Sequence, residues 1–195
     1  MNKKIQIAIN TPWKLINELL LYLTNPFIIF YVRFVCGVKL GRGAKFYGFP
    51  KILRHKGSKI VIGDRFECRN SKFSNPLGIN HPTIICTWNA NSSIQIGNDV
   101  GISGGSIVSE ESIEIGNRVL IGANSTIIDS DFHPLHHGNK RYKKSDVKKE
   151  KVIISDDVFI GMSSIILKGV LLKRNFIVPA GAVIRHNTTF STSRK

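Results

Sequence analysis

The sequence predicts an all-β fold, a left-handed parallel β-helix, because apolar residues return at every sixth position over long stretches. The clearest stretch lies near the C-terminus and comprises Ile154, Ile160, Ile166, Leu172, Val178 and Ile184. A helix repeats about every 3.6 residues and a half-buried strand every 2, so neither produces this spacing. A short period of this kind is typical of a β-helix in which each hexad forms one flat face of a coil.

A second observation is a nine-residue phrase that recurs along the chain. It reads SKIVIGDRF at 58–66, SSIQIGNDV at 92–100, ESIEIGNRV at 111–119 and EKVIISDDV at 150–158. Each phrase has two apolar residues two apart, then Gly or Ser followed by Asn or Asp, and then a final apolar residue. Gly, Asn and Asp tolerate the backbone angles of tight corners. Three hexads and three corners then complete one turn. Between the phrases, the hexads are expected to slip by one residue between two sets: Ile96, Ile102 and Val108, then Ile115, Ile121 and Ile127.

The repeat is interrupted between Ile127 and Val152, and a long excursion from a solenoid is usually a loop on its binding face. We therefore expect one long loop over about 129–151, rich in lysine and arginine in its second half. The expected organisation is an apolar helical segment at 1–38, the β-helix at 39–190 and a disordered tail at 191–195.

Residues 12–38 are strongly apolar, although polar residues interrupt the run and leave no clean span of about 20 apolar residues. Pro12 suits the start of a helix, and Asn25-Pro26 should end or kink it. The favoured interpretation is a cap packed on the end of the β-helix. The alternative is an interfacial helix in peripheral contact with the inner face of the membrane, and a membrane-spanning segment is not expected.

The formal net charge of +15 over 195 residues is the unusual feature of the composition. Such an excess indicates an anionic partner, such as a phosphate, an acidic glycan or an anionic lipid. No nucleic-acid-binding module is recognisable, so no nucleic-acid partner is expected. The three cysteines lack a metal-type spacing, and Cys68 and Cys86 are expected to be small buried hydrophobes of a cytoplasmic protein.

Taken together, the repeats and the loop resemble the hexapeptide-repeat acyltransferases, in particular the galactoside and maltose O-acetyltransferases and the enzymes that acetylate O-antigen, capsule and colanic-acid sugars. The resemblance covers roughly 57–187. It rests on IGNRVLIGANSTI, the loop motif DFHPLHH, SDDVFIGMSSIILKGV and VPAGAVI. It implies a homotrimer that uses acetyl-CoA as a co-substrate and acts on a sugar or oligosaccharide acceptor.

The resemblance also implies that His133, in the His-Pro pair of the loop, is the catalytic base. An imidazole suits this task because its pKa lies near neutrality and the acceptor hydroxyl must lose a proton as it attacks the thioester. Pro134 would stiffen the backbone beside the base. Asp131, two residues earlier, is the candidate to orient the ring or stabilise its protonated form.

Matching the family's last coils residue by residue implies four cofactor-binding residues: Met162, Ser163, Ala180 and Arg185. Small side chains would let the pantetheine arm approach the backbone, and Lys168, Lys173, Arg174 and Arg185 are candidates for the CoA phosphates. The candidate acceptor-binding residues are Ser103, Gly105 and His136. Where the family often has an Asn on an early coil, this chain has Ser103-Gly104-Gly105.

The predicted function is therefore acetyl transfer from acetyl-CoA to a sugar hydroxyl, in the biosynthesis of a bacterial surface polysaccharide. Two alternatives remain at this point. One is N-acylation of an amino-sugar nucleotide, and the other is a zinc hydratase or a binding scaffold on the same fold. His133, His136 and His137 crowd into one loop, whereas zinc needs converging ligands, so no metal is expected. His55, His81 and His186 are interpreted as structural or surface residues.

Overall fold

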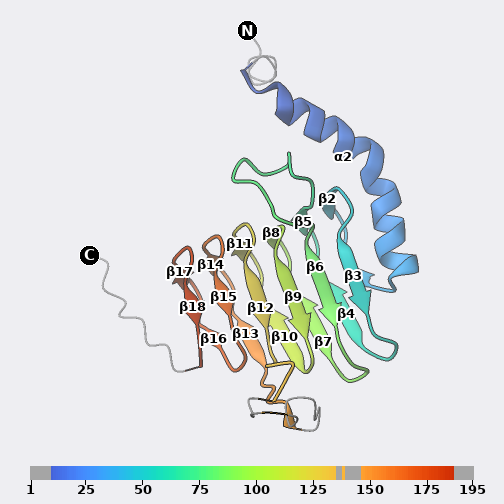
Figure 1. Cartoon of the computed structure of the whole chain (residues 1–195). Helices are drawn as coiled ribbons and strands as arrows, with labels where there is room; N and C mark the ends of the chain where they lie inside the picture. The colour runs from blue at the N-terminus through green and yellow to red at the C-terminus, as the bar shows by residue number, and fades with distance from the viewer. Residues whose placement is uncertain (1–9, 135–137, 139–145, 187–195) are drawn as a thin grey trace.

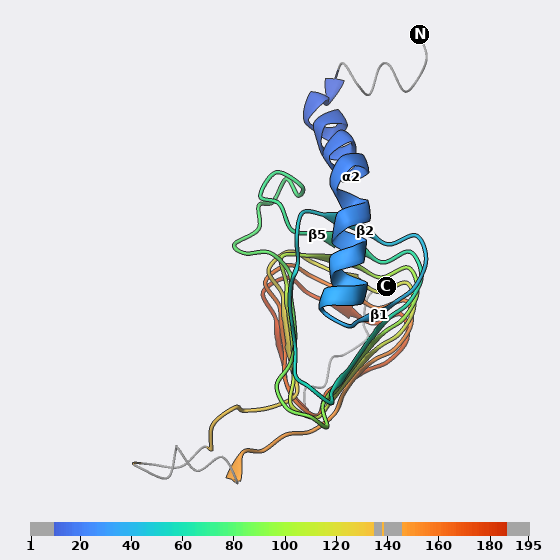
Figure 2. The same cartoon turned by 90° about the vertical axis from the view of Figure 1, so that its right-hand side faces the viewer.

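The computed structural model describes residues 10–134, 138 and 146–186, and these residues form a triangular prism with one helix at its N-terminal end (Figures 1 and 2). Three parallel sheets of six strands each make the faces of the prism. Successive strands of the chain belong to successive sheets, so each coil contributes one strand to each face. This is the architecture of the left-handed parallel β-helix that the hexads predict.

Sheet A contains β1 (Lys39–Leu40), β4 (Lys59–Ile62), β7 (Ser93–Ile96), β10 (Ser112–Ile115), β13 (Val152–Ile154) and β16 (Leu171–Leu172). Sheet B contains β2 (Lys45–Tyr47), β5 (Glu67–Arg69), β8 (Gly101–Ser103), β11 (Leu120–Ile121), β14 (Phe159–Ile160) and β17 (Ile177–Val178). Sheet C contains β3 (Lys51–Arg54), β6 (Ile84–Thr87), β9 (Ser106–Ser109), β12 (Thr126–Ile128), β15 (Ile165–Ile166) and β18 (Val183–Ile184).

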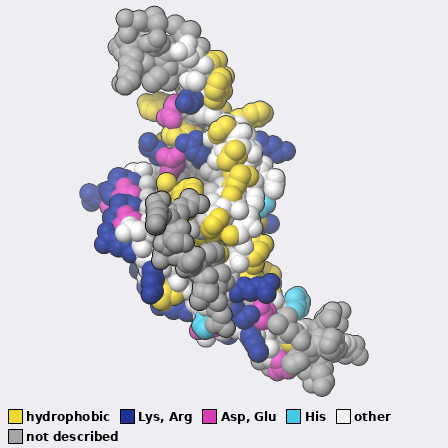
Figure 3. Space-filling model, turned by 90° about the vertical axis from the view of Figure 1, so that its left-hand side faces the viewer, with side chains coloured by type: hydrophobic (Ala, Val, Ile, Leu, Met, Phe, Trp, Pro, Cys, Tyr) yellow, Lys and Arg dark blue, Asp and Glu magenta, His cyan; other side chains and the backbone are white. Residues whose placement is uncertain are grey.

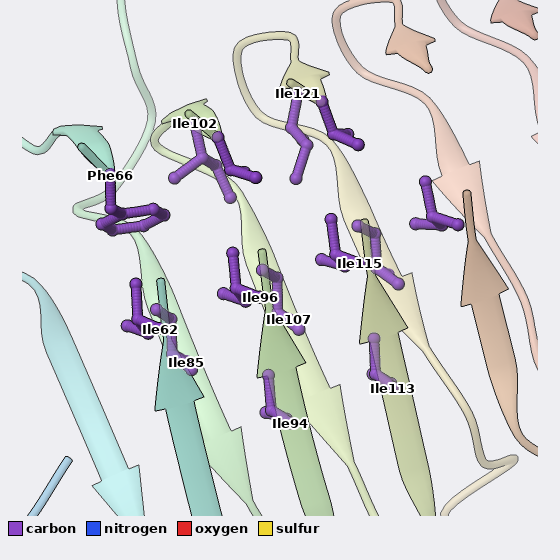
Figure 4. Close-up of a cluster of buried hydrophobic side chains, with 14 of the residues drawn as sticks. Ile62, Phe66, Ile85, Ile94, Ile96, Ile102, Ile107, Ile113, Ile115 and Ile121 are labelled. Carbon is purple, nitrogen blue, oxygen red and sulfur yellow. The ribbon is translucent and has the colours of Figure 1, made fainter. Parts of the chain in front are cut away.

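The core is a ladder of branched side chains that point inward from all three sheets (Figure 4). The register places equivalent positions one above another, as in the stack of Ile62, Ile96 and Ile115 on sheet A. All six residues of the C-terminal hexad series are buried. Cys68 and Cys86 are buried as well, which confirms the prediction for these thiols, and burial raises the pKa of Cys68 to about 12.

One hexad position was predicted wrongly. Ile107 is fully buried and stacks on Ile127, whereas Val108 lies on the outer side of β9. The step from Ile102 to Ile107 is therefore one residue short and the step from Ile107 to Ile115 is two residues long, so the net slip of one residue combines two changes. The short step comes from the corner at Gly104-Gly105, which has two residues where the register gives the next coil three at 123–125, and which Gly104 makes with a φ of +53°.

The N-terminal helix α2 (Pro12–Phe30) continues into one π-helical segment, η1 (Tyr31–Val35). Pro12 begins it as expected, but Asn25-Pro26 does not end it. Both atoms of the Asn25 side-chain amide instead form hydrogen bonds with the first coil (β1–β3), which we call coil 1. Nδ2 donates to the Ala44 carbonyl oxygen and Oδ1 accepts from the Phe46 amide, each at 2.9 Å. These tertiary bonds favour a continuous helix at the point where the local sequence favours a break.

The cap prediction holds only for the end of the helix. Ile28 and Val32 are fully buried in the core cluster, whereas most apolar side chains of α2 are exposed and the helix extends beyond the prism (Figure 1). The 24 residues Pro12–Val35 are also long and apolar enough to cross a membrane, a criterion that core helices and signal sequences meet as well. This finding differs from the expectation drawn from the interrupted sequence.

Candidate functional site

The three edges of the prism differ, and we name them by the sheets they join. The A–B corner has four residues in each of the six coils, as in Gly97–Val100 and Gly116–Val119. The B–C corner carries an excursion at 70–83, and the C–A corner carries the long loop at 129–151. Figure 2 shows the two excursions leaving the prism at different edges. The candidate catalytic, acceptor-binding and cofactor-binding residues belong to these two edges, whereas the phosphate candidates Lys173 and Arg174 lie at the A–B corner.

His133 lies in the long loop at the C–A corner, and its side chain is exposed. The backbone on either side of it is well fixed. Phe132 has a left-handed φ of +57°, and its ring meets that of Trp88 edge-on with centroids 6.2 Å apart. Pro134 is buried. The loop therefore presents the imidazole to solvent from an anchored backbone, which suits a proton-transfer group.

The base of the loop is built on a buried carboxylate that the sequence interpretation missed. Asp129 is fully buried, and it accepts hydrogen bonds from the Ser109 hydroxyl and from the amides of Glu110 and Glu111, at 2.6 to 3.0 Å. Its own carbonyl oxygen accepts from the Glu150 amide at 2.9 Å. The two ends of the loop are thus joined to each other and to the coil before.

Asp131 pairs with a different partner from the one expected. Its Oδ1 lies 2.5 Å from Nζ of Lys168, one coil further on, and both side chains are largely buried. Within the described residues, Oδ2 is buried without a hydrogen-bond partner and no bond joins the carboxylate to the His133 ring. Asp131 instead contacts His133 through the main chain, where the His133 amide donates to the Asp131 carbonyl oxygen at 2.7 Å. Lys168, a candidate for a CoA phosphate, is engaged in this ion pair.

The predicted cofactor residues Met162, Ser163 and Ala180 lie together at the B–C corner of the last two coils. The stacking there is close, since a Cβ on Gly161 would come within 2.4 Å of the Ala180 amide. Ser163 takes a left-handed φ of +56° and is exposed, as is Ala180. This edge therefore presents a narrow row of small residues.

Arg185 lies at the C–A corner, at the open end of the last coil. It lines a hollow of about 590 Å³ together with Lys173 and Arg174, which are two further candidates for phosphate contact. Arg174 also pairs with Asp157 at 2.8 Å. The basic residues around this hollow could bind the phosphates of an anionic cofactor.

The predicted acceptor residues are less accessible. Ser103 and Gly105 belong to the B–C corner of the third coil and are buried. The excursion at 70–83 packs over Gly104 between them, because a Cβ there would meet the Ile79 side chain and the His81 carbonyl oxygen at 2.6 and 2.8 Å. His136 falls outside the described residues, so its role stays a prediction.

The 70–83 excursion brings one more polar group to this edge. The Asn80 amide donates to Oδ1 of Asn124 at 2.8 Å, so the excursion reaches past the third coil to the fourth. Nδ1 of His81 lies 2.8 Å from the Pro82 carbonyl oxygen, which can only accept, so this nitrogen carries the hydrogen. The sequence signal for the 70–83 excursion is the separation between the phrases at 58–66 and 92–100, which is longer than one coil.

Metal binding has no support in the part of the chain that the structure describes, where no group of three His, Cys, Asp or Glu side chains could hold an ion. His136 and His137 lie outside those residues. The Asp131 and Asp129 carboxylates of the same loop both have protein partners.

Two segments of the chain are similar to a known family of repeats. The model of the hexapeptide repeat of succinyl-transferase matches residues 112–129 and 151–185, the coils on either side of the long loop. This match and the three six-stranded parallel sheets make these coils similar to those of the hexapeptide-repeat family. No solved structure gave a significant match.

Among curated proteins, the chain is similar to a galactoside O-acetyltransferase of Lactococcus lactis subsp. lactis (strain IL1403). The two are 32% identical over 78 residues, which is 40% of this chain. The matched segment spans 36% of that relative's length, so the likeness covers about a third of it.

Proposed function

We propose that the protein is a cytoplasmic enzyme that transfers the acetyl group of acetyl-CoA to a hydroxyl of a sugar or oligosaccharide. The observation that carries this proposal is the exposed His133 on an anchored loop, inserted between coils that match the hexapeptide-repeat model. The similarity to a galactoside O-acetyltransferase supports the reaction class and a sugar acceptor. A precursor of a bacterial surface polysaccharide is the acceptor that we propose.

In the proposed reaction, His133 accepts the proton of the acceptor hydroxyl as the oxygen attacks the thioester carbon. A C–O bond forms, the tetrahedral intermediate collapses, and the C–S bond breaks. The imidazolium then returns its proton to the leaving thiolate, so that no covalent enzyme intermediate is required. Asp131 acts in this scheme as a positioning residue, because its ion pair with Lys168 and its main-chain bond fix the backbone at His133.

We also propose that the complete site forms between subunits of a homotrimer. Within one chain, His133 lies at the C–A corner, while Met162, Ser163 and Ala180 lie at the B–C corner, with sheet C between them. If acetyl-CoA follows the row of small residues, its thioester cannot meet the His133 of the same chain across a sheet. The C–A corner of a neighbouring subunit would supply it.

In this arrangement the pantetheine arm lies along Met162, Ser163 and Ala180, and the nucleotide phosphates lie toward Arg185 and the basic hollow of the last coil. Ser103, Gly105 and His136 are the proposed acceptor contacts. Because the first two are buried, they would act through the backbone or after the adjacent 70–83 excursion moves. The half-buried His81 of the same excursion is a further polar group at this edge.

The test is His133→Asn, assayed by thiol release from acetyl-CoA with a panel of sugars, nucleotide sugars and oligosaccharides. We expect kcat to fall by roughly 10²–10⁴-fold, because the general base is lost while the exposed position tolerates the change. His55→Asn is the matched control, since His55 is also exposed at the C–A corner but belongs to the first coil. Sedimentation and thermal melting should not change in either variant.

Near-normal turnover of His133→Asn would contradict the general-base assignment. Acetylation of only amino-sugar nucleotides would instead identify an N-acyltransferase. If the wild-type protein neither binds CoA in calorimetry nor releases thiol, the proposed acetyl transfer is wrong and the scaffold function replaces it. Stoichiometric zinc in the purified protein would point to the hydratase.

A further inference from the structure

Over most of its length helix α2 is amphipathic in the reverse of the usual sense, although Leu21 and Ile28 are buried. Its polar side chains face the protein and bond to it: Asn17 Nδ2 donates to the Phe73 carbonyl oxygen at 2.9 Å and Glu18 accepts from the Tyr47 hydroxyl at 2.9 Å. Further along, Asn25 bonds coil 1. The partly buried guanidinium of Arg33, in η1, donates to the carbonyl oxygens of Leu40 and Gly41. A surface helix in water normally buries its apolar side instead.

The opposite side of the helix is a continuous apolar stripe. Its members recur at alternating spacings of three and four residues, and each is 51% to 73% exposed: Trp13, Ile16, Leu20, Leu23, Phe27, Phe30 and Phe34. A parallel row, Leu15, Leu19 and Tyr22, widens the stripe. Figure 3 shows hydrophobic side chains on the surface of the helix, beyond the body of the prism. An exposed apolar surface of this length marks a contact with an apolar partner.

The charge of the chain is concentrated at the same end of the molecule. Residues 1–72 contain 14 lysines and arginines and only 3 acidic residues, whereas residues 73–195 contain 14 and 10. The helix and the first coils therefore carry +11 of the formal net charge of +15. Basic residues beside an apolar stripe are the combination that binds anionic lipid headgroups and the acyl boundary beneath them.

Charge also decides between two apolar partners for the stripe. A second copy would bring another strongly basic end against this one, and the like charges would repel. An anionic bilayer would attract it. The stripe itself is rich in aromatic side chains, which favour the membrane interface over a coiled-coil seam of Leu and Ile.

We propose that α2 lies in the interface of an anionic bilayer, with its apolar stripe in the acyl boundary and the basic first coils facing the headgroups. The helix lies along the membrane and does not cross it, because Asn17, Glu18, Asn25 and Arg33 hold it to the protein over most of its length. This proposal does not depend on acetyl transfer. It places the prism at the membrane face, where a lipid-linked acceptor would be found.

The experiment is flotation of the full chain with vesicles of phosphatidylcholine alone or with roughly 30% phosphatidylglycerol. We expect binding to the anionic vesicles that weakens with salt. The variant Leu20→Gln, Phe27→Gln, Phe30→Gln should lose about tenfold or more in affinity, because three interfacial anchors are removed from positions that are exposed in the folded protein. The matched control is Phe159→Gln, Leu171→Gln, Ile177→Gln, which removes three exposed apolar side chains from the far end of the prism and should bind like the wild type.

Three results would overturn the proposal. Failure of the wild type to float with anionic vesicles would exclude the membrane as the partner. Equal loss in the helix variant and the control would show that general hydrophobicity, not α2, drives binding. A wild-type protein that resists extraction by salt and carbonate and needs detergent would span the bilayer instead. Sedimentation of both variants reports whether the stripe joins copies of the chain, and turnover reports separately on the proposed enzyme.

Discussion

The A–B and C–A corners are made by the same stacked coils, yet one is uniform and the other is not. The A–B corner has four residues in every coil, from Gly41–Ala44 to Lys173–Phe176. The C–A corner ranges from two residues at Glu110–Glu111 to the whole loop at 129–151. Both close the same prism, so the difference lies in how each corner satisfies its polar groups.

At the A–B corner, each coil supplies the partner for the coil before it. Oδ1 of Asp64, Asn98, Asn117 and Asp156 accepts, in turn, from the backbone amides of Arg42, Asp64, Asn98 and Asn117 at 2.7 to 2.9 Å. A second ladder alternates in charge beside it, pairing Arg65 with Asp99 and Arg118 with Asp157. Figure 3 shows acidic and basic side chains gathered along one edge of the prism. Such a ladder fixes the length of the turn, because one added residue would misalign every donor.

The C–A corner lacks a continuous ladder of this kind in the described residues. Its polar groups are satisfied at single points between two adjacent coils, as Asp129 does for Ser109, Glu110 and Glu111. A corner without a ladder that repeats in every coil can lengthen. This difference explains physically why the candidate base lies at the C–A corner and why the A–B corner carries no excursion.

The largest expected effect is that of lengthening the uniform corner. Insertion of one Gly after Asn98 should misalign four hydrogen bonds, those at the amides of Asp64, Asn98, Asp99 and Arg118, and should lower the free energy of unfolding by about 4 kcal/mol. Insertion of one Gly after Gly138 should change it by about 0.5 kcal/mol or less, since a long loop tolerates an added residue. Urea unfolding at fixed protein concentration measures both, and equal losses would contradict the role of the ladder.

The fold was predictable because the hexad is a strictly local signal that the stacked register repeats, as in Ile154, Ile160 and Ile166. The five-residue step from Ile102 to Ile107 was missed, because its cause is a two-residue corner at Gly104-Gly105. That corner is short because an excursion from the previous coil lies over it, a long-range contact with no local signal.

The candidate site was predictable only in part, for the same reason. The interruption of the repeat and the His-Pro pair located His133. The pairing of Asp131 with Lys168 requires the register across 37 residues, which the loop length alone does not give. The orientation of α2 could not be predicted from the sequence either. Asn25 and Arg33 bond to backbone atoms of the first coil, and backbone acceptors produce no pattern of side chains in the sequence.

The second prediction concerns the local anchor of the C–A corner. Asp129→Ala should lower the free energy of unfolding by about 3 kcal/mol, because it leaves two backbone amides and a hydroxyl without their charged acceptor. Ser109→Ala, which removes one of the three donors and leaves the carboxylate two partners, should cost about 1 kcal/mol. Asp129→Ala should also reduce turnover more than Ser109→Ala, since the loop that carries His133 begins there. A loss as small as that of Ser109→Ala would show that the corner does not depend on Asp129.

The smallest expected effect is a pH dependence of stability that arises at the A–B corner. Hydrogen bonds from Arg118 and then Arg174 lower the pKa of Asp157 to about 2, against an ordinary value near 3.8. A carboxylate whose pKa is lower in the folded state binds protons more readily when the chain unfolds. Its stabilising contribution is therefore complete above about pH 4 and is lost as the pH falls toward 2. The melting temperature should fall over this range, less steeply in Asp157→Asn, and the difference should shrink in high salt because the group is exposed. If Asp157→Asn melts with the same pH slope as the wild type, the charge ladder contributes nothing measurable, and the A–B corner owes its uniform length to the Asn and Asp acceptors alone.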